Sequence, residues 1–224
     1  MIIKHLTLYA QNLTQQKNFF VDVLGFELIR ESEKSFEIQA GMSILKFEYH
    51  SESKAFHFAF GIPFSMYKTA FSWLKERVEI IKDGENEIVD FPAWDAKAIY
   101  FYDQDHNICE FIARKSIPEN IGERFSLNHI FNVAEIGLVT SNIKSIYDKL
   151  HQQTSVKMYD GSLDRFLAVG DDDGLFICID PKKKDWFPNN DKAEIADFIA
   201  EVEILDKNYS IKYLNEELEI SSLN

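Results

Sequence analysis

The segment Tyr100–Arg114, YFYDQDHNICEFIAR, contains two strand-like runs separated by a tight acidic turn. The second run carries one carboxylate, Glu110, with apolar residues on both sides. A carboxylate in such a setting is costly to bury unless it is paired, hydrogen-bonded or bound to a metal ion. Glu110 therefore needs a partner, which another part of the chain must supply.

Two histidines in similar settings are the candidate partners. His5 lies in IIKHLTLYA and His57 in FHFAFGI, each early in an apolar segment of alternating character. Two imidazoles and a carboxylate brought together by adjacent strands form a facial set of ligands with open coordination positions, which suits Fe(II), Mn or Zn. The pattern predicts a metal site of His5, His57 and Glu110.

The order of predicted elements repeats along the chain. Residues 1–49 predict a strand, a helix and three short strands, and residues 55–115 predict the same order. A third copy follows, in which Glu135 stands where His5 stands in the first, and a truncated fourth copy opens around Phe198 without a histidine. This repetition predicts an α+β fold in which paired βαβββ modules form curved, half-barrel mixed sheets.

The same pattern predicts two domains. Residues 1–115 are expected to form a two-module domain that holds the metal site. Residues 116–128 contain proline, glycine and mixed charge, which is typical of a linker. Residues 129–224 are expected to form a degenerate, truncated second domain whose metal set is not intact.

Composition limits the class of partner. The 224 residues carry a formal net charge of -13, which argues against nucleic acid because such binding depends on lysine and arginine neutralising phosphates. No apolar run approaches the ~20 residues that span a bilayer. Cys109 and Cys178 lie in apolar runs, where cysteines are usually buried and unpaired. We expect a cytoplasmic protein with neither a nucleic-acid nor a membrane partner.

Three motifs in order resemble those of a known superfamily. HLTL at 5–8, HFAFGI at 57–62 and YFYDQDHNICEF at 100–111 resemble the vicinal oxygen chelate superfamily. This group includes glyoxalase I, fosfomycin-resistance transferases, extradiol dioxygenases and bleomycin-binding proteins. The resemblance covers residues 1–115 and continues beyond them only as a decayed copy.

The resemblance implies a metal-dependent enzyme that acts on a small oxygen-bearing substrate chelated to Fe, Mn, Zn or Ni. By position, His5, His57 and Glu110 match the ligands of the superfamily. The reaction stays open between lyase or isomerase, transferase and dioxygenase chemistry. Lys46 stands where glyoxalase I has a fourth ligand, and the loop VDFPAWDAK lacks the histidine of extradiol dioxygenases and the lysine and serine pattern that grips a phosphonate.

Three further residues are candidates for contact with substrate. Lys46 could neutralise an anionic substrate or act as a base, and Tyr100 is a second catalytic candidate. Thr7 could orient the substrate by hydrogen bonding. The competing interpretation makes the aromatic residues part of the core and pairs Glu110 with Lys46 or Arg114.

A second function is also open. Some members of the superfamily are metal-free modules that sequester drugs in a hydrophobic trough, and a fold does not determine its function. The pattern does not decide whether the site closes within one chain or across a homodimer.

Overall fold

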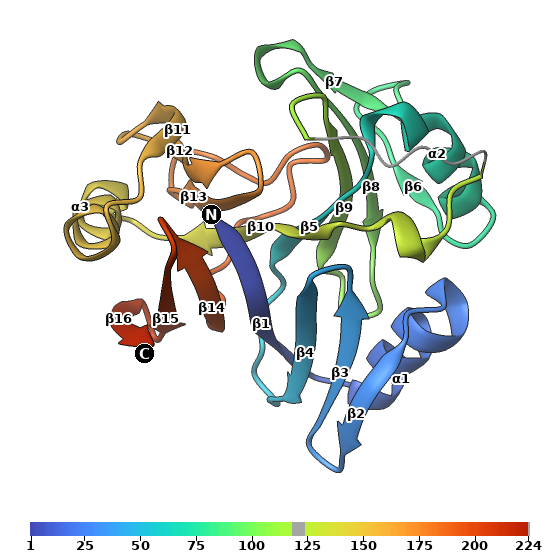
Figure 1. The fold of residues 1–224 in the computed structure, drawn as a ribbon, viewed down its shortest axis with the longest axis horizontal. Helices are drawn as coiled ribbons and strands as arrows, with labels where there is room; N and C mark the ends of the chain where they lie inside the picture. The colour runs from blue at the N-terminus through green and yellow to red at the C-terminus, as the bar shows by residue number, and fades with distance from the viewer. Residues whose placement is uncertain (118–123, 224) are drawn as a thin grey trace.

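Strands dominate the fold, which is given by a computed structural model that describes residues 1–117 and 124–223 (Figure 1). Sixteen strands of these residues join one sheet, and the longest path through it runs β16-β15-β14-β1-β10-β5-β9-β8-β6. The helices lie at the periphery of the sheet in Figure 1. The α+β architecture of curved, paired modules predicted from the sequence is confirmed.

The first module begins with the strand that holds His5. Its helix starts after Asn12, whose side chain accepts a hydrogen bond from the backbone N–H of Gln15 at 3.1 Å. The helix continues as a π-helical turn and ends at Gly25, whose φ of +88° is left-handed. The elements are β1 (Ile2–Ala10), α1 (Leu13–Lys17), the π-helical turn Asn18–Leu24, β2 (Leu28–Ser32), β3 (Ser35–Ala40) and β4 (Ser43–Tyr49).

The second module repeats this order with an insertion before its last hairpin. Its first strand holds His57 and its last strand holds Glu110. The elements are β5 (His57–Gly61), a 3₁₀ turn (Phe64–Met66), α2 (Tyr67–Lys75), β6 (Ile80–Ile81), β7 (Val89–Phe91), a second 3₁₀ turn (Pro92–Trp94), β8 (Ala96–Tyr102) and β9 (Ile108–Arg114).

The third module is complete, whereas the fourth is a three-stranded meander. Among the described residues no helix separates the first two strands of the fourth module, which are joined by a tight turn at Leu205 and Asp206. The elements are a 3₁₀ turn (Leu127–His129), β10 (Asn132–Val139), α3 (Ile143–Thr154), β11 (Met158–Ser162), β12 (Phe166–Asp171), β13 (Gly174–Ile179), β14 (Phe198–Ile204), β15 (Lys207–Leu214) and β16 (Glu217–Leu223).

The modules pair in a different order from the one expected. Strand β5 pairs antiparallel with β10, and β1 pairs antiparallel with β14, so the second module joins the third and the first joins the fourth. The expected domain of residues 1–115 is therefore not closed on itself. The expected linker, 116–128, lies partly outside the described residues, and strand pairing crosses the boundary that it was expected to mark.

Alternation along the strands separates a core face from a concave face. In β5, Phe58 and Phe60 belong to the main hydrophobic core, whereas His57 and Ala59 point to the other side. In β9, Phe111 joins the same core and Glu110 lies on the opposite face. The period of two thus places imidazole and carboxylate on one side of the sheet.

No helix within residues 1–117 or 124–223 has the length and apolarity needed to cross a membrane.

The cysteines match the expectation for buried, unpaired thiols. Cys109 and Cys178 are both free and fully buried. Burial raises the pKa of Cys178 to about 12, so this thiol stays protonated at neutral pH.

A buried carboxylate ties the first helix to the last hairpin of the second module, and removing it should destabilise the protein. Asp103 accepts hydrogen bonds from the side chains of Gln16 at 2.5 Å and Asn107 at 2.7 Å. Asp103→Ala leaves these buried donors without an acceptor, so we expect a loss of about 1–3 kcal/mol in the free energy of unfolding. Urea denaturation measures it. The exposed control Asp22→Ala should change stability by less than about 0.5 kcal/mol; equal losses in the two variants would contradict this assignment.

Candidate metal centre

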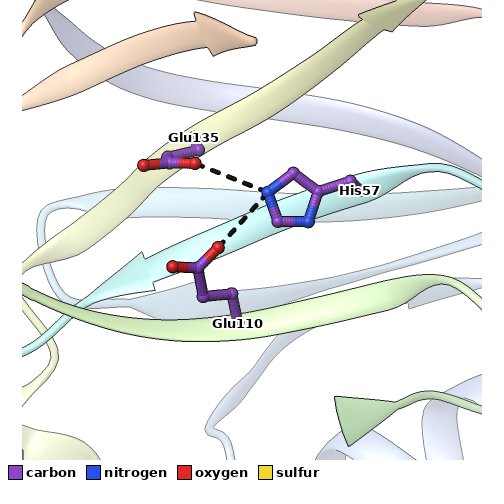
Figure 2. Close-up of side chains that lie close together, drawn as sticks. All are labelled: His57, Glu110 and Glu135. Carbon is purple, nitrogen blue, oxygen red and sulfur yellow. Dashed lines mark hydrogen bonds and ion pairs between the residues drawn. The ribbon is translucent and has the colours of Figure 1, made fainter. Parts of the chain in front are cut away.

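Three neighbouring strands bring one imidazole and two carboxylates together on the concave face. His57 comes from β5, Glu110 from β9 and Glu135 from β10, and Figure 2 shows one ring nitrogen of the imidazole facing both acids. His57 Nε2 lies 3.4 Å from an oxygen of each glutamate. Candidate ligand atoms of all three residues lie within 4.8 Å of one another, and the side chains are buried. The site lies within a single chain.

The backbone orients the imidazole. His57 Nδ1 lies 3.0 Å from the carbonyl oxygen of Ile108, which can only accept, so Nδ1 carries the proton of this hydrogen bond. In the neutral ring Nε2 then presents its lone pair to the glutamates. Ligands at about 2.1 Å from one ion lie roughly 3.0–3.5 Å apart, which matches the two separations of 3.4 Å between His57 Nε2 and the glutamates. The three groups therefore have the geometry of a coordination site.

Charge in the site is only partly balanced. Burial raises the pKa of Glu110 well above its usual range, and the nearby Glu135 raises it further, whereas Arg114 acts in the opposite direction. Arg114 forms a buried ion pair with Glu135 and also donates to the carbonyl oxygen of Asp172 at 3.2 Å. Glu110 Oε1 is buried without a hydrogen-bond partner. The arrangement fits a divalent cation, which would supply the missing positive charge.

A cavity of about 480 Å³ opens beside the three residues. The indole of Trp186 forms one wall, with its ring centroid 5.4 Å from that of His57. This packing depends on Gly137, because a Cβ at that position would lie 2.6 Å from the indole. The cavity is large enough for a small organic molecule.

Comparisons with known proteins bear on the fold. No protein-family model matches the sequence. Metallothiol transferase FosB of Staphylococcus haemolyticus (strain JCSC1435) is 28% identical over 116 residues, which are 46% of this chain and 76% of FosB. A putative dioxygenase from Bacillus subtilis superposes with a TM-score of 0.64 at 12% identity, over 99% of this chain and 84% of its own. The V278E mutant of glyoxalase I from Zea mays superposes with a TM-score of 0.53 at 15% identity, over 80% of this chain and 66% of its own.

The chain has the vicinal oxygen chelate fold. The strand and module organisation carries this assignment, and the likeness to FosB adds a local sequence match. The resemblance to this superfamily predicted from the sequence is confirmed.

Two of the three predicted ligands lie in the site, together with one predicted catalytic residue. His57 and Glu110 converge as described above. Tyr100 lies opposite Glu110 in the β8–β9 pair and lines the cavity. Burial and the charges of Glu110 and Glu135 raise the pKa of its hydroxyl well above the usual value, so Tyr100 is a neutral hydrogen-bond donor there.

His5 belongs to the other pair of modules, and Glu135 takes the position expected for it. The strand register relates the two modules. His5 pairs with Ile44 as His57 pairs with Ile108, and each histidine is the first residue of its strand to pair with the last strand of its module. Since β1 pairs with β14 instead of β5, His5 lies opposite Glu201. The predicted set of His5, His57 and Glu110 is therefore not brought together.

Lys46 and Thr7 also lie in the other pair of modules. Lys46 pairs with Thr7 as Glu110 pairs with Ala59, and its ammonium forms an ion pair with Glu48 at 2.7 Å. Neither Lys46 nor Thr7 lines the cavity beside His57. The contacts to substrate expected of them are thus not supported by their positions.

The sequence contained one signal for the missing ligand. Glu135 occupies in the third module the place of His5 in the first, so aligning the repeats identifies it. Arg114 was considered only as a partner of Glu110, whereas the structure pairs it with Glu135. Trp186 lies outside the regular strands and has no periodic signal.

Gly137→Ala should displace the indole of Trp186, because the added methyl group overlaps it. We expect a loss of about 1–3 kcal/mol in the free energy of unfolding, which is typical of overpacking. Replacing Trp73 and Trp94 by Phe leaves Trp186 as the single tryptophan of the chain. In that background, Gly137→Ala should shift the fluorescence emission of Trp186. In the Trp186→Phe variant the smaller ring leaves room for the added methyl group, so Gly137→Ala should cost less stability there. An equal loss of unfolding free energy in both backgrounds would contradict this explanation.

Arg114→Met should leave the Glu135 carboxylate buried without its cation. We expect a loss of about 3–5 kcal/mol in the free energy of unfolding of chelator-treated protein. Adding Glu135→Met should restore much of it, because the charge is then removed as well. Arg30→Met, at an exposed arginine, is the control and should cost less than about 0.5 kcal/mol. If the changes in unfolding free energy of Arg114→Met and Glu135→Met were strictly additive in the double variant, the ion pair between the two residues would contribute nothing to stability.

Proposed function

We propose that this protein is a divalent-metal-dependent enzyme that binds its metal through His57, Glu110 and Glu135. The observation that supports it most directly is the convergence of these three groups, with Glu110 Oε1 buried and unpartnered. One imidazole and two carboxylates form a mixed donor set that suits Mn, Fe(II) or Zn, and Ni is also compatible. A bound ion would polarise an oxygen of the substrate and stabilise negative charge that develops on it.

The protein residues would hold and orient the substrate. The cavity receives a small oxygen-bearing molecule beside the three ligands, and aromatic side chains form much of its lining. Tyr100, which is buried and neutral, would donate a hydrogen bond to a substrate oxygen. Arg114 would hold Glu135 in place through their ion pair.

The exact reaction is left open among those of the named relatives. The name of FosB describes a metallothiol transferase, and the two structural relatives are described as a putative dioxygenase and a glyoxalase I. The alternative, a metal-free sequestering module, is disfavoured because it gives no role to three convergent, buried ligands. A homodimer stays a prediction.

Metal content tests the proposal without knowledge of the substrate. Protein purified without a metal-binding tag and incubated with Mn(II), Fe(II), Zn or Ni should retain about one equivalent of at least one of them by mass spectrometry. His57→Ala and Glu135→Gln should each lose most of it. Metal at about 100 times its Kd should raise the free energy of unfolding of the native protein by about 2.7 kcal/mol.

The matched control is His5→Ala. It removes the histidine at the equivalent place in the first module and should leave the metal content unchanged. If His5→Ala loses the metal and Glu135→Gln keeps it, the ligand set is wrong. If the native protein takes up none of the four metals, the metal-dependent function is wrong.

A further inference from the structure

The cavity beside the metal centre has an aromatic middle section. Phe166 stacks on Trp94 with their ring centroids 6.4 Å apart, and the ring of Phe187 meets that of Tyr100 at 5.7 Å. All four residues line the cavity, together with Trp186. Walls of this kind favour a ligand with a planar, apolar body.

Two cations lie at one part of this cavity. Arg165 and Lys184 both line it, and the Lys184 ammonium lies 5.8 Å from the centre of the Phe166 ring. Burial and the charge of Arg165 lower the pKa of Lys184, which reflects their proximity. Within residues 1–117 and 124–223, neither side chain forms an ion pair. Arg165 is exposed and Lys184 is half-buried, so both cations are available to an anionic ligand that enters the cavity from solvent.

Strand register separates the cations from the metal centre. Glu135 pairs with Leu175 across β10 and β13, whereas Val139, four residues further, pairs with Ile179, which in turn pairs with Phe166. At about 3.3 Å per residue, the Phe166 end lies on the order of 13 Å from Glu135 along the strands. A ligand that reaches both ends is therefore elongated.

Two residues that line the cavity each have a buried polar atom without a partner. Trp186 Nε1 and Glu110 Oε1 are both buried without a hydrogen bond in the described structure. The N–H can only donate and the carboxylate oxygen can accept or bind a metal. Such groups are costly to leave unsatisfied. An acceptor oxygen that reached the indole N–H, and a metal ion that reached Glu110 Oε1, would remove that cost.

The number of charges favours a monoanion over a phosphate. Asp160 also lines the cavity and accepts a hydrogen bond from the indole N–H of Trp94 at 2.6 Å. Among the cavity-lining residues other than His57, Glu110 and Glu135, the charges of Arg165, Lys184 and Asp160 sum to one positive unit. A carboxylate matches this charge, whereas a phosphate dianion exceeds it.

We propose that the substrate is an elongated organic carboxylate, with vicinal oxygens at the metal end, a planar apolar body between the aromatic walls, and its carboxylate bound by Arg165 and Lys184. The metal end of this assignment rests on the proposed function. The carboxylate end rests on the cations alone and can be tested separately.

Calorimetric titration of the Mn(II)-loaded protein tests the assignment with a matched pair of probes. The first is a benzohydroxamate with a para-propionate arm, because a hydroxamate chelates metals through two vicinal oxygens. The second is the corresponding propionamide, which is neutral and of similar shape. We expect the carboxylate probe to bind about tenfold tighter or better, since charge-assisted hydrogen bonds are stronger than neutral ones. The preference should shrink in about 0.5 M salt.

Variants locate the preference. Arg165→Gln and Lys184→Gln should each reduce it severalfold while leaving the affinity for the propionamide unchanged. Lys182→Gln is the control, because Lys182 is exposed and does not line the cavity. Equal binding of the two probes by the native protein, or loss of the preference only in Lys182→Gln, would overturn the proposal.

The same titrations on metal-free protein separate this proposal from the proposed function. Phenylpropionate and phenylpropionamide replace the hydroxamates there. A carboxylate preference that is lost in Arg165→Gln supports the anion subsite even if no metal binds. Absence of the preference in both metal-loaded and metal-free protein overturns the subsite, whereas the metal content still decides the proposed function.

Discussion

Two carboxylates buried against each other are the constraint on which the site depends. Glu110 and Glu135 repel one another in surroundings that cannot screen their charges, and burial has already raised the pKa of Glu110. Arg114 balances one charge by pairing with Glu135, and the neutral form of His57 adds none. A stable arrangement therefore requires either a proton on Glu110 or a cation between the three groups. The geometry around Nε2 of His57 accommodates the cation.

The pairing of modules creates this constraint and also the space beside it. Because β5 lies between β9 and β10, the three groups come from adjacent strands and face the same way. Gly137, which has no side chain, leaves room for the indole of Trp186, and this indole forms a wall of the cavity. A larger residue at position 137 would displace that wall.

The local sequence pattern predicted which side chains share one face of a strand, whereas the tertiary pairing of strands decided which strand lies next to it. The alternation in β5 and β9 correctly placed His57 and Glu110 on one face, because a period of two is a property of each strand alone. The partner of β5 is a property of the assembled sheet, so His5 was chosen where Glu135 lies. Arg165 and Trp186 were missed for a different reason, since their positions depend on a hairpin and a loop without periodic pattern.

The two pairs of modules show how one geometry carries different chemistry. At the positions of His57, Glu110 and Glu135, the pair of first and fourth modules has His5, Lys46 and Ile199. An ammonium in place of a carboxylate repels a cation, and isoleucine offers no ligand atom, so register alone does not make a metal site. The segments that wall the cavity, 91–94 and 160–187, belong to the second and third modules. Because the fold is shared by proteins of different reactions, these segments are where the choice of substrate must be made.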